Sequence, residues 1–186
     1  LIDDLHSDGA TETGYAICGS LFVAVDEQEG DEFKRSTIGF PDGDGHDPDR
    51  AAVVSSDRAK ELFPALGKVT GALFSPTAAR VDGRQLAAAL ETAAVSHGVE
   101  VQHRSVDAID SARNSVSVRA EGEDIEAGHV VIAGGAWSQT FSEQLDVSIP
   151  VGPQRGQIIH LDLGDLDTSG WPIITGMGEH YMVPWP

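Results

Sequence analysis

An uninterrupted apolar run that ends in two glycines constrains the fold more than any other stretch of the sequence. Residues 130–133 read Val-Val-Ile-Ala, and Gly134 and Gly135 follow directly after Ala133. A strand without polar alternation is typical of a parallel sheet that is covered on both faces. Because glycine has no Cβ atom, the pair lets the backbone turn sharply or lets a ligand approach closely. The sequence therefore predicts a buried strand that ends in a tight turn.

A helical pattern follows the two glycines. Trp137, Phe141 and Leu145 recur at intervals of one helical turn, which predicts a helix over 137–145. A strand, a glycine turn and a helix N-terminus place free backbone N–H groups at the carboxyl edge of a sheet, where α/β proteins bind anionic cofactors. A tight turn that binds nothing explains the same residues equally well. Both interpretations stay open at this point.

The charge balance narrows the possible partners. Acidic residues number 30 against 12 Lys and Arg, which gives a formal net charge of -18 over 186 residues. Such a surface repels phosphate, and so it disfavours nucleic acid and anionic membranes as partners. The acidic residues are spread among periodic apolar segments, which favours a folded surface adapted to high salt over a disordered acidic tail.

The location of the protein is predicted from what the sequence lacks. No apolar run approaches the roughly 20 residues of a membrane span, and no basic, apolar leader stands at the start. A single cysteine, Cys18, excludes an internal disulfide and fits a reducing compartment. We therefore expect a cytoplasmic protein. The sequence does not indicate its oligomeric state.

The remaining pattern predicts strands and helices in alternation. Residues 15–25 are rich in β-formers, and Gly19 suggests a bulge there, whereas the charged segment 26–35 is expected to be a solvated loop. Asp82, with Gln85 three residues on, is the clearest helix cap, and Gly98 marks the end of that helix. A short helix capped by Ser56 is expected to run towards Phe63, and a turn is expected at 111–114. Further strands are predicted at 69–74, 99–102, 105–110, 115–120, 124–126, 158–163, 173–174 and 181–183.

One acidic segment, residues 42–49, has the alternating oxygen ligands of a calcium-binding loop. The match fails at two positions, because the sixth residue is Asp47 rather than glycine and the twelfth is Val53 rather than glutamate. We predict an acidic loop here and no metal site.

Several segments, taken together and in order, resemble FAD-dependent oxidoreductases of the D-amino-acid oxidase, glycine oxidase and sarcosine oxidase type. Their order and spacing extend over nearly the whole chain, so the resemblance is specific for the family but says little about the substrate. The segments are TGYAICGSLFVAV (13–25), VDGRQLAAALETAAVSHGVEVQHRSVDAI (81–109), HVVIAGGAWS (129–138), PQRGQIIHLD (153–162) and HYMVP (180–184).

The resemblance implies an α/β fold (α+β mixed) built from two discontinuous domains. Part of a Rossmann-like FAD-binding domain would comprise 81–140, with 1–8 as the end of one of its helices. A substrate domain, with a mixed sheet over the flavin, would comprise 9–80 and 141–186.

The resemblance also assigns the cofactor-binding residues. The residue in the place of Val106 would offer backbone groups to the adenine ring of FAD. Ala133, Gly134 and Gly135, with Trp137 beside them, would lie against the ribose and pyrophosphate. Without the family, Val106 would read as an ordinary inward-facing strand valine.

Tyr181 lies where glycine oxidase-like members place a tyrosine that faces the substrate. The alternative is a core tyrosine whose hydroxyl is hydrogen-bonded. Arg155 and Gln157 match an RGQ segment of the family, and we interpret them as structural.

The sequence departs from the family pattern at its most specific motif. The dinucleotide fingerprint G-x-G-x-x-G is absent, because Tyr181 stands where a third glycine should follow Gly176 and Gly178. Trp185 stands where many relatives carry an arginine. We therefore predict the central fragment of an oxidoreductase that oxidises a small amine or amino acid (glycine, sarcosine or D-amino acid class) by hydride transfer to flavin.

The isolated chain is expected to be inactive. Two alternatives remain, a non-catalytic binding domain derived from the same fold and, ranked last, a nicotinamide-dependent dehydrogenase.

Overall fold

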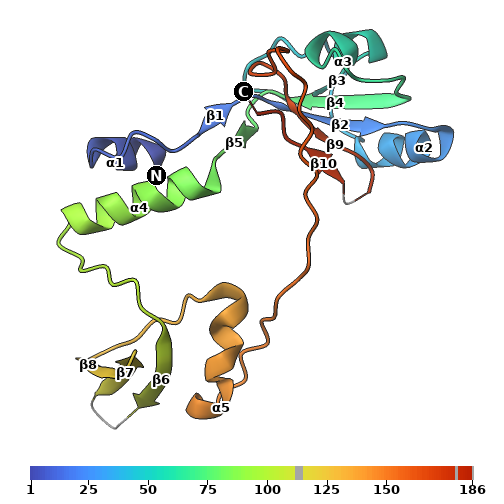
Figure 1. Ribbon diagram of the computed structural model, residues 1–186. Helices are drawn as coiled ribbons and strands as arrows, with labels where there is room; N and C mark the ends of the chain where they lie inside the picture. The colour runs from blue at the N-terminus through green and yellow to red at the C-terminus, as the bar shows by residue number, and fades with distance from the viewer. Residues whose placement is uncertain (112–114, 179, 186) are drawn as a thin grey trace. The chain divides into compact units, whose positions relative to one another are not determined.

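The computed structural model describes residues 1–111, 115–178 and 180–185 (Figure 1). The chain forms two compact units. The first combines Leu1–Glu100 with Leu163–Pro186, and the second is Val101–Asp162. Each unit has its own sheet, and each is described by itself below.

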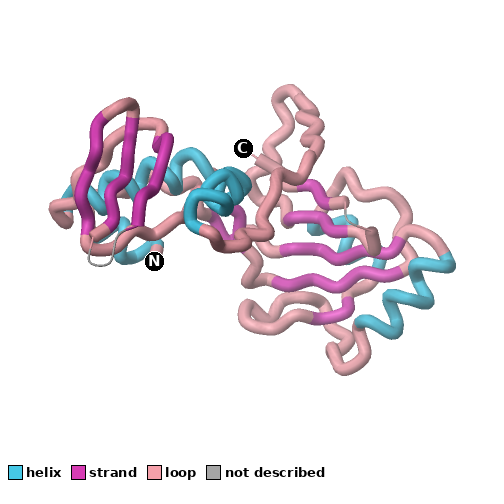
Figure 2. The backbone as a smooth tube through the Cα atoms, turned by 90° about the horizontal axis from the view of Figure 1, so that it is seen from below, coloured by secondary structure: helices cyan, strands magenta, loops and turns pink. Residues whose placement is uncertain are grey.

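A five-stranded mixed sheet is the centre of the first unit. Figure 2 shows its strands side by side, in the order β10-β9-β2-β4-β3. The central strand β2 pairs in parallel with β9 and antiparallel with β4, and the other pairs are antiparallel. The strands are β2 (Ser20–Ala24), β3 (Ala52–Val53), β4 (Gly71–Ser75), β9 (Ile173–Thr175) and β10 (Tyr181–Met182).

One face of this sheet is covered by the main core. Leu21, at 0% exposure, lies in a cluster with Phe63 of the segment that follows α3 (Ser56–Leu62) and with Trp171 before β9. The rings of Phe63 and Trp171 are 4.6 Å apart, and such aromatic pairs add to the burial energy. Ser55, one residue earlier than predicted, caps α3 by accepting a hydrogen bond from the Arg58 N–H.

The predicted loop at 26–35 is wrong, because this segment is helix α2 (Glu27–Ser36). The Asp26 carboxylate accepts a hydrogen bond from the Glu29 N–H, and the Glu29 carboxylate accepts one from the Val25 N–H. These paired caps start the helix. Phe33 then anchors it, since the ring is buried and stacks on Phe22 of the sheet at 5.8 Å.

A smaller apolar cluster in the same unit joins α1 (Ile2–Ser7) to α4 (Gly83–Ser96) through Leu5, Ala89 and Ala93. The predicted cap of α4 is confirmed, because the Asp82 carboxylate accepts hydrogen bonds from the N–H groups of Arg84 and Gln85. The short strands β1 (Ala16–Ile17) and β5 (Ala79–Arg80) pair antiparallel.

The second unit contains an antiparallel three-stranded sheet. Its strands are β6 (Val106–Ser111), β7 (Val116–Ala120) and β8 (Glu123–Ala127), which confirms the predicted hairpin. Most of the turn predicted at 111–114 lies outside the described residues. Charged pairs tie the strands, since Asp124 hydrogen-bonds Arg119 and raises its pKa, while Arg104 lowers the pKa of Glu123.

The buried strand predicted at 130–133 is wrong. Residues 130–133 form no strand, and Val131 is 87% exposed. A strand covered on both faces needs hydrogen-bonded neighbours on its edges, and no described segment pairs with this one. The strands predicted at 99–102 and 158–163 are also wrong, for the same reason. The helix predicted at 137–145 is present but starts earlier, as the 3₁₀ helix η1 (Gly135–Phe141), followed by α5 (Ser142–Leu145).

Candidate functional site

The glycine turn exposes its backbone. Gly134 precedes η1, and its carbonyl accepts a hydrogen bond from the Trp137 N–H at 3.0 Å. Gly135 has a φ of +53°, a conformation that L side chains rarely adopt, and a Cβ atom there would meet no atom within 4 Å. The Trp137 side chain is 76% exposed. Ala133 is exposed as well. The turn therefore exposes the backbone at Gly135 and the ring of Trp137, as a surface that contacts a nucleotide would have to do.

Val106 belongs to the same unit as the glycine turn. It begins β6, an edge strand of the three-stranded sheet, and its side chain is exposed. Gln144 of α5 fastens that strand, because its Oε1 accepts from the Ile109 N–H at 3.0 Å and its Nε2 donates to the Asp107 carbonyl at 3.4 Å. The short helices that follow the glycine turn are thus bonded to the strand that Val106 begins.

Tyr181 lies at the edge of the five-stranded sheet. It is 67% exposed and pairs with Thr175 across β9 and β10. The alternative of a core tyrosine is therefore excluded by its exposure. Tyr181 and the residues predicted to bind the cofactor belong to different units, and each group is described within its own unit.

Tyr181 shares its face of the sheet with half-buried residues. Leu21, Phe74 and Ile174 are paired neighbours on the covered face, and all are buried. Their chain neighbours alternate to the other face, one end of which is covered by α2, because Phe33 lies against Phe22 and Gly71. We call this second face the open face. There Phe22 pairs with Leu73 and Thr175, and Thr175 pairs with Tyr181. The open face is half-exposed along β2, β4 and β9 except at Ala24, which is 0% exposed.

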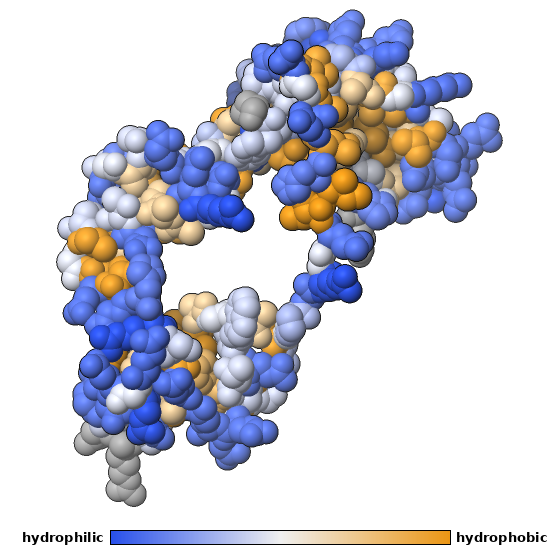
Figure 3. All heavy atoms as spheres, in the orientation of Figure 1, coloured by the Kyte–Doolittle hydropathy of each residue, from blue (hydrophilic) through white to orange (hydrophobic). Residues whose placement is uncertain are grey.

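The open face carries no charged residue on its strands, within the part of the chain that the structure describes. In this chain 23% of residues are charged, and the exposed side of a one-sided sheet is ordinarily polar. Figure 3 shows hydrophobic residues, in orange, at the surface of the unit that holds this sheet. An uncharged, partly aromatic face with hydroxyl groups suits a small organic ligand better than bulk water. The strand residues of the open face are Ser20, Phe22, Ala24, Val53, Gly71, Leu73, Ser75, Ile173, Thr175 and Tyr181.

The sequence analysis missed the open face apart from Tyr181. Residues 71–75, Gly-Ala-Leu-Phe-Ser, carry a signal for this face, because their side chains alternate strictly between half-buried and buried in the structure. Period-2 burial identifies which residues share a side, but only the strand order shows that Ser20, Ser75 and Thr175 lie on the same face as Tyr181.

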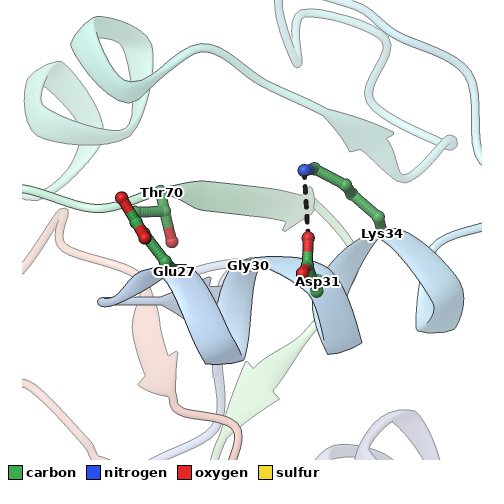
Figure 4. A pocket seen from close by; sticks show the side chains of 5 residues that line it. All are labelled: Glu27, Gly30, Asp31, Lys34 and Thr70. Carbon is green, nitrogen blue, oxygen red and sulfur yellow. Dashed lines mark hydrogen bonds and ion pairs between the residues drawn. The ribbon is translucent and has the colours of Figure 1, made fainter.

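Two polar regions outside the open face, a pocket on α2 and the acidic loop 42–49, contain internal hydrogen bonds and ion pairs. Figure 4 shows a surface pocket on α2 in which Lys34 pairs with Asp31, at 3.3 Å. The hydroxyl of Thr70, which also lines the pocket, donates to the Asp26 carbonyl. In the acidic loop 42–49, the His46 backbone N–H donates to Asp44 and holds the pKa of that carboxyl below its usual range. No metal-binding group of three or more His, Cys, Asp or Glu occurs among the described residues. In the same residues, no helix is long and apolar enough to cross a bilayer.

A mixed sheet, together with a second unit that presents a glycine turn, gives this protein a mixed α/β fold of the type found in flavin-dependent oxidases. The crystal structure of iminodiacetate oxidase (IdaA) from Chelativorans sp. BNC1 matches 99% of this chain and 50% of that chain, with a TM-score of 0.82 and 33% sequence identity. The chain belongs to the FAD dependent oxidoreductase (DAO) family, which matches over residues 1–186.

Curated relatives agree with this assignment. The uncharacterized oxidoreductase YurR of Bacillus subtilis (strain 168) is 26% identical over 183 residues, which is 98% of this chain and 49% of the relative. Glycine oxidase of Geobacillus kaustophilus (strain HTA426) is 28% identical over 162 residues, 86% of this chain and 42% of the relative. The chain thus spans about half the length of the relatives it matches.

The predicted family, the mixed α/β fold class and FAD as the cofactor of that family are confirmed. The domain boundaries and the roles of Val106, Ala133, Gly134, Gly135, Trp137 and Tyr181 stay predictions.

Proposed function

We propose that these 186 residues form part of a flavoenzyme that oxidises a small amine or amino acid, of the glycine, sarcosine or D-amino acid class. The observation that carries the proposal is an exposed tyrosine, Tyr181, on an uncharged sheet face of a chain that belongs to an FAD-dependent family. Two of the matched proteins are named for substrates of this kind, an iminodiacetate oxidase and a glycine oxidase. Because the relatives are about twice as long, the activity is proposed for the whole protein.

The second unit supplies the groups proposed to hold FAD. The open backbone at Gly135 lets a pyrophosphate or ribose come close, and Ala133, Gly134 and the exposed Trp137 extend the same surface. Val106 contributes the edge strand that is bonded to α5. Bound by these residues, FAD would supply the hydride-accepting chemistry that oxidation of an amine requires.

The first unit supplies the groups proposed to hold the substrate. Tyr181 can orient an amine or carboxylate through its hydroxyl, while the half-buried Ile173 on the same face keeps water away from the reacting carbon. The oxidation requires a neutral amine. Since the described residues of the open face include no Asp, Glu, His or Lys, the substrate is proposed to bind with its amine already deprotonated.

The absence of a G-x-G-x-x-G motif from these 186 residues leads to a prediction about their affinity for FAD. We expect the isolated chain to bind FAD weakly and to show no amine oxidation, because the peptide N–H groups of that motif hold the pyrophosphate in such folds. The protein extended at its N-terminus by a strand–glycine–helix unit is expected to bind FAD tightly. Titration followed by flavin fluorescence and calorimetry measures both, and submicromolar binding by the isolated chain would contradict the prediction.

The activity itself is tested in the extended, FAD-loaded protein. Under anaerobic conditions, glycine, sarcosine, iminodiacetate or a D-amino acid is expected to bleach the flavin absorbance. A protein that binds FAD but is reduced by none of these would instead favour a non-catalytic binding domain.

We also propose that the acidic surface is an adaptation to high salt and that the protein works in the cytoplasm. The net charge of -18 supports the first statement, and the single, free Cys18 supports a reducing compartment.

Stability is therefore expected to rise with salt. At ~0.01 M salt the carboxylates repel one another over ~30 Å, whereas at ~1 M that range falls to ~3 Å. We expect the free energy of unfolding to fall by at least about 1 kcal/mol at the lower concentration, which lowers Tm by roughly 2–4 °C. Thermal unfolding in KCl measures this. Sucrose is the control, because it is excluded from the protein surface but does not screen charge. An equal gain in the free energy of unfolding in sucrose would contradict the screening argument.

A further inference from the structure

A buried arginine of the first unit has no carboxylate partner among the residues that the structure describes. Arg80, the last residue of β5, is 8% exposed. Its Nη1 donates to the Pro184 carbonyl at 3.0 Å and its Nη2 to the Ser169 carbonyl at 3.3 Å. The guanidinium carbon lies 5.2 Å from the centroid of the Trp185 ring. In a chain with 30 acidic residues, this cation is satisfied by two carbonyl oxygens and an aromatic face.

The two carbonyl groups flank the β9–β10 hairpin. Ser169 precedes β9 and Pro184 follows β10, so one guanidinium group holds both ends of the hairpin. Thr168 strengthens the same closure, because its hydroxyl donates to the Trp185 carbonyl at 2.9 Å. We call this set of contacts the Arg80 clasp.

The position of Tyr181 depends on the clasp because strand β10 is short and pairs on one side only. The strand comprises Tyr181 and Met182 alone, at the edge of the sheet, and it pairs only with β9 among the described strands. Pro184 is three residues from Tyr181. Fixing the Pro184 carbonyl therefore fixes the direction in which the chain leaves β10.

We propose that Arg80 is a positioning residue that holds Tyr181 on the open face by clasping the ends of the β9–β10 hairpin. The inference rests on the proposed function for its effect on substrate, but the clasp itself is a property of the fold. Lysine cannot replace Arg80, because a single ammonium lacks the planar fork that reaches two carbonyls at once.

The first test compares Arg80→Lys with Arg84→Lys in the extended, FAD-loaded protein. Arg84 is an exposed arginine in the first turn of α4, and so it receives the same chemical change without a clasp. Hydrogen exchange of a peptide covering 181–185 is expected to be about tenfold faster in Arg80→Lys, while exchange in α2 stays unchanged. Thr168→Val should shift the same peptide in the same direction by less. Unchanged exchange at 181–185 in a folded Arg80→Lys would overturn the proposal.

The second test asks whether Arg80 acts through Tyr181. Arg80→Lys is expected to raise KM for the amine about tenfold and to leave the FAD dissociation constant within about twofold. In a Tyr181→Phe background the same substitution should change KM little, since coupled residues are not additive. A full tenfold effect in that background would refute positioning through Tyr181. If the parent protein oxidises no amine, the proposed function fails, and hydrogen exchange alone decides the clasp.

Discussion

Leu21→Ala is expected to lower the free energy of unfolding by about 3 kcal/mol, one of the largest effects of a single substitution in this chain. Leu21 is 0% exposed on the central strand β2, where it pairs with Phe74 on one side and Ile174 on the other. Removing its side chain leaves a cavity in the core that covers this face of the sheet, beneath a strand that is hydrogen-bonded on both edges. Because the backbone cannot collapse into that space, the full cavity cost is expected.

The matched control is Leu90→Ala, the same change at a residue 44% exposed on α4. Its effect should stay below about 1 kcal/mol, because little apolar area leaves water there on folding. Urea unfolding in molar salt measures both, followed by the fluorescence of the buried Trp171. Equal losses for the two variants would mean that the five-stranded sheet is not the stabilising core.

The elements that could be predicted from the sequence are those specified by local signals. Asp82 caps α4 as expected, because a carboxylate followed by an apolar stripe is sufficient to start a helix. The β6–β7 hairpin follows from alternation on both sides of a short turn. In each case the residues that determine the element are neighbours in the sequence.

Two wrong predictions have opposite physical causes. The charged segment that forms α2 shows a single apolar anchor, Phe33, and its helix depends on contact with Phe22 across the sheet. The apolar run at 130–133 has every local property of a buried strand, yet a strand forms only where a neighbouring strand supplies hydrogen bonds. The local sequence pattern thus fails to predict the helix in the first segment and predicts a strand that does not form in the second.

The candidate site shows the same division. The glycine turn and Tyr181 could be located from short motifs and a family resemblance. The open face could not, because Phe22, Leu73 and Thr175 are brought together by strand order. The contacts of Arg80 could not be predicted from the sequence either, since its partner Pro184 is 104 residues away along the chain.

Gly135→Ala in the extended, FAD-loaded protein is expected to weaken FAD binding by about a hundredfold. The φ of +53° at Gly135 costs an alanine roughly 1–2 kcal/mol, and the added methyl group fills the open space through which a pyrophosphate is proposed to approach. Flavin fluorescence titration gives the dissociation constant. Gly128→Ala is the control in the same unit, because Gly128 has no positive φ and no close neighbour.

A second substitution separates backbone strain from close approach. Asparagine tolerates the left-handed conformation better than alanine does, so Gly135→Asn relieves much of the strain while it adds a larger side chain. If the cofactor lies against this turn, Gly135→Asn should lose as much FAD affinity as Gly135→Ala. If the glycine serves only the turn, Gly135→Asn should bind FAD nearly as well as the parent protein. That second result would remove Gly134 and Gly135 from the proposed site and leave the turn a structural feature alone.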